Sequence, residues 1–170
     1  MAEVEALNPL READLESILQ QAWELVRAEP GWSGYLPGSE RIERALTFRL
    51  GVRLCRVIDF ERHQWPQPWD GLTVDSELHR AHNGSKLGST QAPDLVVHVR
   101  GTDAYNLLAI EAKHALEPDA DDVNKLRRLR VERGYRCTWA VRLDLDGPLI
   151  IRKIGSDGVE GAPVHRLEQG

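Results

Sequence analysis

Residues 93–113, PDLVVHVRGTDAYNLLAIEAK, decide the fold of this chain. Apolar runs at 95–99 and 107–112, with a polar turn between them at 101–103, predict two short neighbouring strands. Side chains alternate between the faces of a strand, and the second run is apolar on both of its faces. It therefore predicts an interior strand, covered above and below.

Ionisable side chains stand at the end of this interior strand. Glu111 and Lys113 share one face, and Asp94 opens the preceding strand. Burying a carboxylate or an ammonium group is costly unless another charge compensates it. Two compensations are open: a mutual salt bridge between Glu111 and Lys113, or a divalent cation held by Glu111 and Asp94. Two carboxylates near one lysine at a strand end are what metal-assisted phosphodiester hydrolysis requires.

The spacing of these residues carries a family resemblance. Pro93-Asp94, sixteen intervening residues and then Glu111-Ala112-Lys113 resemble the PD-(D/E)xK signature of restriction-endonuclease-like nucleases. Asp94 begins one predicted strand, Glu111-Ala112-Lys113 closes its neighbour, and a predicted helix follows. The flanking stretches 75–80 and 121–126 also resemble small uncharacterised members of that superfamily. The resemblance covers roughly residues 40 to 145.

The resemblance implies a Mg²⁺-dependent endonuclease that hydrolyses phosphodiester bonds of DNA, with Mn²⁺ able to substitute. By that resemblance Asp94 and Glu111 hold the metal, helped by the backbone carbonyl of Ala112. Lys113 orients the attacking water and stabilises the charge that develops on the phosphate. The metal polarises the phosphoryl oxygen and lowers the pKa of bound water.

The stretch 72–79 predicts the first strand, with Asp75, Glu77 and His79 on one face. An acidic stripe on an antiparallel strand is usually solvated, and this is the expectation for Asp75. Glu77 stands between two interpretations. Strand alternation places it in solvent, whereas the resemblance makes it a further metal ligand beside Asp94.

Basic residues in two places are candidate nucleic-acid contacts. Arg80 and Lys86 lie in the polar, glycine-bearing segment 80–91, near the proposed site. Lys125 and Arg128 lie in a helix predicted between Pro118-Asp119 and Gly134. The acidic start and basic end of this helix also match the helix dipole, so a structural explanation stands beside the functional one.

The remaining elements complete an α/β pattern. Apolar residues at spacings of three and four predict two helices within 8–54. Glu43, one residue off the second stripe, is expected to be an exposed charge, although the resemblance leaves a place at the metal site for a helical acid before the first strand. Residues 137–154 predict two strands joined by a hairpin turn at Asp146-Gly147. The order helix, helix, three strands, helix, two strands predicts a mixed central β-sheet flanked by helices, similar to the restriction endonuclease core.

Length and composition indicate one ordinary globular domain. Its 170 residues are 41% hydrophobic and 29% charged, values at which a chain buries a sizeable core. It divides into N-terminal helices at 8–54, a nuclease-like core at 72–154 and a loosely ordered tail at 155–170. No segment resembles a signal peptide or a membrane span, and Cys55 and Cys137 form no disulfide or metal pattern, so a cytoplasmic location is expected.

Charge leaves a rival from another class open. The net charge of −5 argues against a protein that coats nucleic acid, although a nuclease needs only a local basic face. The rival is a non-catalytic module of the same fold that binds DNA or a protein partner in a defence or repair assembly. The complete set of Asp94, Glu111 and Lys113 counts against it. RNA as the substrate stays an open alternative, as does a homodimer that would let one small domain cut both strands.

Overall fold

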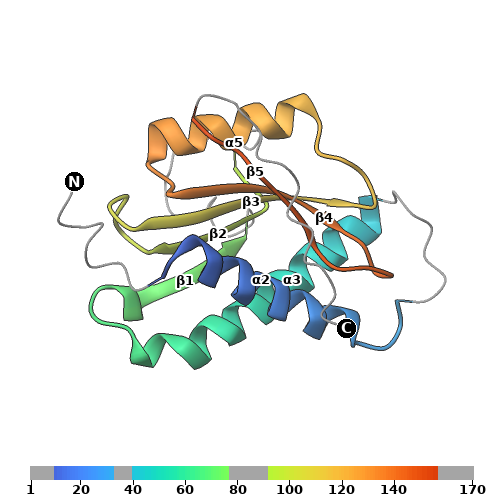
Figure 1. The fold of residues 1–170 in the computed structure, drawn as a ribbon, viewed down its shortest axis with the longest axis horizontal. Coiled ribbons are helices and arrows are strands. Elements are labelled where there is room, and N and C mark those ends of the chain that lie inside the picture. Colours follow the sequence, from blue (N-terminus) through green and yellow to red (C-terminus); the bar gives the residue numbers. More distant parts are fainter. Residues whose placement is uncertain (1–9, 33–39, 77–91, 157–170) are drawn as a thin grey trace.

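The computed structural model describes residues 10–32, 40–76 and 92–156 (Figure 1). Within them the chain forms three α-helices, two short 3-10 turns and five strands, in an order that confirms the α/β expectation. The elements, in chain order, are α2 (Glu12–Arg27), α3 (Glu40–Glu61), η1 (Arg62–Gln64), η2 (Trp69–Gly71), β1 (Leu72–Ser76), β2 (Leu95–Val99), β3 (Asn106–His114), α5 (Ala120–Arg133), β4 (Cys137–Leu143) and β5 (Ile150–Lys153).

The strands form one mixed sheet in the order β1-β2-β3-β4-β5. Neighbours run antiparallel except β3 and β4, which are parallel and are joined by the α5 crossover. This is the connection that a parallel pair requires, because a tight hairpin can join only antiparallel strands. β3 therefore lies in the middle of the sheet, as the two apolar faces of its sequence predict, and all but one of its residues are buried.

Helices cover the two faces of the sheet differently (Figure 1). On one face α3 packs against β1 and β3, with α2 beside it, and this side holds the larger apolar core, including Leu46, Leu50 and Ile110. On the other face α5 packs against β3 and β4 through Leu126 and Leu129. Glu111 shares the α5 face with Ala109, because residues two apart point the same way along a strand.

The structure differs from the sequence expectations at two helix boundaries and in the burial of one side chain. The first helix begins at Glu12, where the backbone N–H of Arg11 is bound by the Asp14 side chain at 2.8 Å. The second helix continues past residue 54 to Glu61, because Val57 and Ile58 extend its buried stripe by another turn. In β1 the expectation of a solvated acidic face is wrong for Asp75, whose side chain is only 5% exposed.

Other turn and capping predictions are confirmed. Asp119 caps α5 by accepting hydrogen bonds from the N–H groups of Asp121 and Asp122, both at 2.9 Å. Gly134 ends the helix in the left-handed conformation, with φ of 65°. A turn forms at the predicted place, closed by the N–H of Gly147 on the carbonyl of Asp144 at 3.2 Å, but β4 ends at Leu143 and β5 begins at Ile150, so the connection is longer than a tight hairpin turn. No helix in the described residues combines the length and the apolar character needed to cross a bilayer.

Candidate functional site

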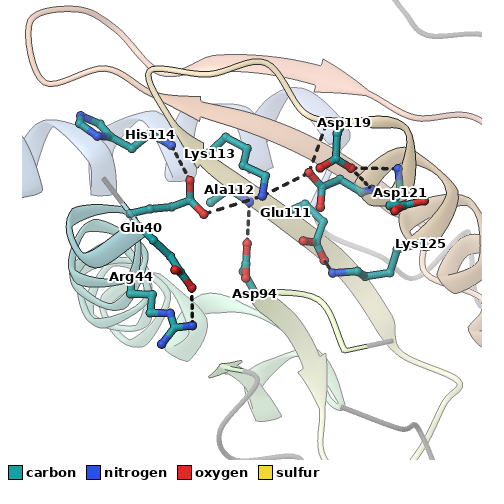
Figure 2. A network of polar contacts seen from close by, with 12 residues as sticks. Glu40, Arg44, Asp94, Glu111, Ala112, Lys113, His114, Asp119, Asp121 and Lys125 are labelled. Carbon is teal, nitrogen blue, oxygen red and sulfur yellow. Dashed lines mark hydrogen bonds and ion pairs between the residues drawn. The ribbon is translucent and has the colours of Figure 1, made fainter. Parts of the chain in front are cut away.

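Asp94 is fixed at the point where β2 and β3 part. It immediately precedes β2, and Leu95 pairs with Ile110 across the antiparallel ladder. The Asp94 carboxylate accepts a hydrogen bond from the backbone N–H of Ala112 at 2.8 Å (Figure 2). The acid of the first predicted strand is thereby tied to the middle residue of the Glu-Ala-Lys triplet, as the strand-end prediction requires.

Glu111 is a buried carboxylate with only one cationic partner among the described residues. Its side chain is 3% exposed, and its Oε1 lies 2.9 Å from Nζ of Lys125. Figure 2 shows its carboxylate lying between Asp94 and Lys125. Burial and the negative charge of Asp94 raise the pKa of Glu111 to about 8, although Lys125 acts in the opposite direction. A carboxyl group with a strongly perturbed pKa at the end of a strand is a candidate functional group.

Lys113 points to a different set of acids. Its Nζ lies 3.5 Å from Oδ2 of Asp122 and 3.8 Å from Oε1 of Glu43. Burial acts to lower the pKa of Lys113, but these two carboxylates raise it above its ordinary value. The mutual salt bridge left open for Glu111 and Lys113 is therefore replaced by two separate arrangements, since Glu111 pairs with Lys125 instead.

Two acids outside the predicted set of site residues, Glu43 and Asp122, hold Lys113; the resemblance leaves a place for Glu43, but the expectation from its own helix was a solvent-exposed charge. Glu43 was expected to be exposed, but it is half-buried, and its Oε2 accepts the backbone N–H of His114 at 3.2 Å. The cause is tertiary: the start of α3 lies against the end of β3, which no local pattern of α3 reveals. Asp122 is buried in the first turn of α5, where it also accepts the N–H of Asp119 at 3.3 Å. The capping spacing of Asp119 and Asp122 was the available signal.

The structure places the predicted nucleic-acid-binding residues in different surroundings. Lys125 is 20% exposed and faces Glu111, so in this structure it belongs to the acidic cluster. Arg128 is exposed on α5. Glu77, Arg80 and Lys86 lie outside the described residues.

Four carboxylates of the described residues gather around two lysines. Glu43 and Asp122 contact Lys113, Glu111 contacts Lys125, and the charge of Asp94 acts on both Glu111 and Lys125. Like charges in a poorly solvated site repel strongly, and protonation of Glu111 or a bound cation relieves that repulsion.

The described residues form no closed metal cage. Within residues 10–32, 40–76 and 92–156, no three His, Cys, Asp or Glu side chains form a group able to hold a metal ion. Mg²⁺ keeps several waters and is commonly bound through one or two carboxylates together with substrate phosphates. Asp94, Glu111 and the Ala112 carbonyl are the oxygen donors that would hold such an ion.

Comparisons with known proteins add no relative. No family model, no curated protein and no solved structure matches this chain. The functional interpretation therefore rests on the residues and their geometry.

Proposed function

We propose that this protein is a divalent-metal-dependent endonuclease that hydrolyses phosphodiester bonds of DNA. The main supporting observation is the position of Asp94, which the N–H of Ala112 holds near enough to Glu111 that its charge, together with burial, raises the pKa of Glu111 to about 8. A site that holds two acids together against their repulsion suits a cationic ligand. Lys113 beside them supplies the positive group that phosphate chemistry needs.

Each residue has a distinct part in this proposal. Asp94 and Glu111, with the carbonyl of Ala112, would hold Mg²⁺, which when bound supplies Lewis-acid polarisation of the phosphoryl oxygen and a more acidic water. Lys113 orients the attacking water and stabilises the charge that develops on the phosphate. Glu43 and Asp122 keep the Lys113 ammonium in place, since both lie within 3.8 Å of its Nζ.

The direct test is cleavage by purified protein in Mg²⁺, with plasmid DNA, single-stranded DNA and RNA as parallel substrates. Asp94→Asn, Glu111→Gln and Lys113→Met should each lower the cleavage rate by roughly 10³-fold, because each removes a group that acts on the transition state. Glu132→Gln and Lys153→Met are matched controls, since Glu132 is exposed on α5 and Lys153 pairs with Glu12 at 3.2 Å at the far edge of the sheet. The controls should keep the wild-type rate.

Two results would contradict this function. Wild-type cleavage by Lys113→Met or Asp94→Asn protein would exclude the assigned roles. Cleavage of RNA but not DNA would keep the chemistry and change the substrate.

One observation favours a non-catalytic module of the same fold. Lys125 already lies 2.9 Å from Glu111, so the acid has a protein counter-charge without any metal. Calorimetric titration with Mn²⁺ separates the two functions. The endonuclease requires a Mn²⁺ site that is lost in Asp94→Asn protein, whereas the module predicts no heat of binding in either.

A further inference from the structure

A second charged cluster lies on β1 and β2. Oδ2 of Asp75 accepts hydrogen bonds from Nε2 of His98 at 2.8 Å and from Nε of Arg100 at 3.0 Å. Nη2 of Arg100 binds the other oxygen, Oδ1, so the guanidinium grips the carboxylate with two parallel bonds. These contacts hold the Asp75 carboxylate from two sides.

The strand register places this cluster on the same face of the sheet as the candidate site. Asp75 pairs with Val96, and Val96 pairs with Ala109. Ala109 and Glu111 share a face, because they are two positions apart on β3. A row of side chains therefore runs from β3 across β2 to Asp75 on β1, one step along the strands from Glu111. This row is buried: Val96 packs in the same apolar cluster as Leu126 and Leu129 of α5, so among these residues it is Arg100 that carries the polar surface outward.

The two partners differ sharply in exposure. The Asp75 side chain is 5% exposed, whereas that of Arg100 is 59% exposed. The local pairs Arg11–Asp14 and Arg44–Glu40 differ from this pair. Their arginines are more exposed than Arg100, and their acidic partners are accessible to solvent as well. Exposed pairs exchange readily with water and fix little geometry. A buried carboxylate with two donors instead fixes the direction of the arginine that it holds.

The orientation of Arg100 leaves part of the guanidinium available. Nε and Nη2 face Asp75, and Nη1 makes no hydrogen bond to any other described residue. The planar guanidinium carries five N–H donors and remains charged at all ordinary pH values. Donors that are held rigidly and still reach solvent suit a phosphate oxygen, because little side-chain entropy is lost when the phosphate binds.

We propose that Arg100 is a phosphate-binding residue for the nucleic-acid backbone, and that Asp75 is the positioning residue that orients it. The identity of the ligand rests on the proposed function, whereas the geometry does not. A strand with its scissile phosphate at Asp94 and Glu111 that continues over the β1 side of the molecule would bring another of its phosphates to the exposed guanidinium of Arg100. Phosphate contacts of this kind set register and orientation and carry no sequence information.

Binding of a short labelled DNA duplex, measured by fluorescence anisotropy in EDTA over a range of NaCl concentrations, tests the assignment. Arg100→Gln should weaken binding by about tenfold and lower the slope of log affinity against log salt by about one, the signature of one lost phosphate contact. Arg11→Gln removes the same charge from an exposed pair on α2 and should change neither quantity appreciably. An unchanged salt slope in Arg100→Gln protein would overturn the proposal.

Asp75→Asn gives the sharper readout. This substitution removes a negative charge, so a purely electrostatic surface would bind DNA more tightly after it. The proposal predicts weaker binding, because Arg100 loses its fixed direction. Tighter or unchanged binding by the folded variant would contradict the positioning role. If Asp75→Asn protein fails to fold, Arg100→Lys replaces it: the charge is kept and the planar geometry is lost, so affinity should still fall.

Two further arms separate the possible outcomes. Titration with inorganic phosphate shows whether Arg100 serves a free anion. Phosphate binding that depends on Arg100, with duplex binding unaffected, would overturn the nucleic-acid assignment. Because the binding assay contains no metal, an Arg100 effect in a protein that never cuts DNA would end the proposed endonuclease and keep the phosphate contact. Normal cleavage together with unchanged DNA binding by Arg100→Gln protein would keep the endonuclease and overturn the phosphate contact.

Discussion

Asp75 and Glu111 are both buried carboxylates on one face of the same sheet, yet their environments push their pKa values in opposite directions. Hydrogen bonds from Arg100 lower the pKa of Asp75 to about 2, although burial opposes this shift, and His98 adds to the lowering. Burial and the neighbouring Asp94 charge raise the pKa of Glu111 to about 8. The fold thus provides Asp75 with enough donors to remain ionised, whereas Glu111 is left short of positive charge. A carboxylate that the protein does not fully compensate is the one that suits an external cation.

The contrast can be tested most strongly through the stability cost of Glu111. The folded protein holds a proton on Glu111 between about pH 4.5 and pH 8 that the unfolded chain releases. The free energy of unfolding should therefore fall across this range, by on the order of 4 kcal/mol. Glu111→Gln should abolish that slope, so the variant should be the more stable protein at pH 8. Urea unfolding of both proteins at several pH values, without metal, measures the effect.

The matched control for that measurement is Glu132→Gln, which replaces an exposed carboxylate on α5 and should keep the wild-type slope. Addition of Mg²⁺ gives a second check. A cation that replaces the proton on Glu111 should stabilise the wild type and leave Glu111→Gln unaffected. A wild-type free energy of unfolding that stays constant from pH 5 to pH 8 would show that folding does not raise the pKa of Glu111.

Asp75 should show the opposite sign at a lower pH. Its folded pKa is depressed to about 2, so its ion pair contributes stability above about pH 4 that is lost as the pH falls through 2. Asp75→Asn should therefore be less stable than the wild type by about 2 kcal/mol at neutral pH, and the difference should vanish near pH 2. Acid titration of the unfolding free energy measures it. A difference that persists unchanged to pH 2 would mean that packing and not charge is responsible.

The smallest expected effect concerns Lys125, whose positive charge only partly offsets the burial of Glu111 and the charge of Asp94. Lys125 lowers the pKa of Glu111 through their contact at 2.9 Å. Lys125→Met should therefore raise the pKa of Glu111 further, by about one pH unit. The pH at which the Glu111-dependent loss of stability ends should move upward by that amount. Lys153→Met, at the far edge of the sheet, should leave that pH unchanged. An equal shift in both variants would contradict a specific effect of Lys125 on Glu111.

Much of the fold could be predicted from the sequence, because local patterns carry it. The apolar faces of β3 determine its central place, and the capping residues determine the ends of α5. The contact of Asp94 with Ala112 was also predictable in outline, since both lie where two adjacent strands part. Each of these features depends on residues close together in the chain or on neighbouring strands.

The missed residues depend on longer-range geometry. Glu43 reaches Lys113 only because α3 lies with its start against the end of β3. Asp75 is held by Arg100, twenty-five positions later, which donates hydrogen bonds to it across the β1–β2 pair. Strand alternation indicates which face a side chain takes, but it does not reveal whether a distant arginine will cover that side chain. The chemistry of Glu111 had the same difficulty, since its lysine partner comes from α5.

The β3–α5–β4 crossover has a consequence for how the chain can vary. Glu111, Lys113, Asp122 and Lys125 all belong to one continuous segment of fifteen residues, which turns at the end of β3 and returns along the sheet as α5. Most of the site thus comes from this one segment, which we call the β3–α5 cassette. The β4–β5 turn lies outside the β3–α5 cassette. Insertions at this turn can change the surface of the molecule while the spacing of the four ionisable groups of the cassette is preserved.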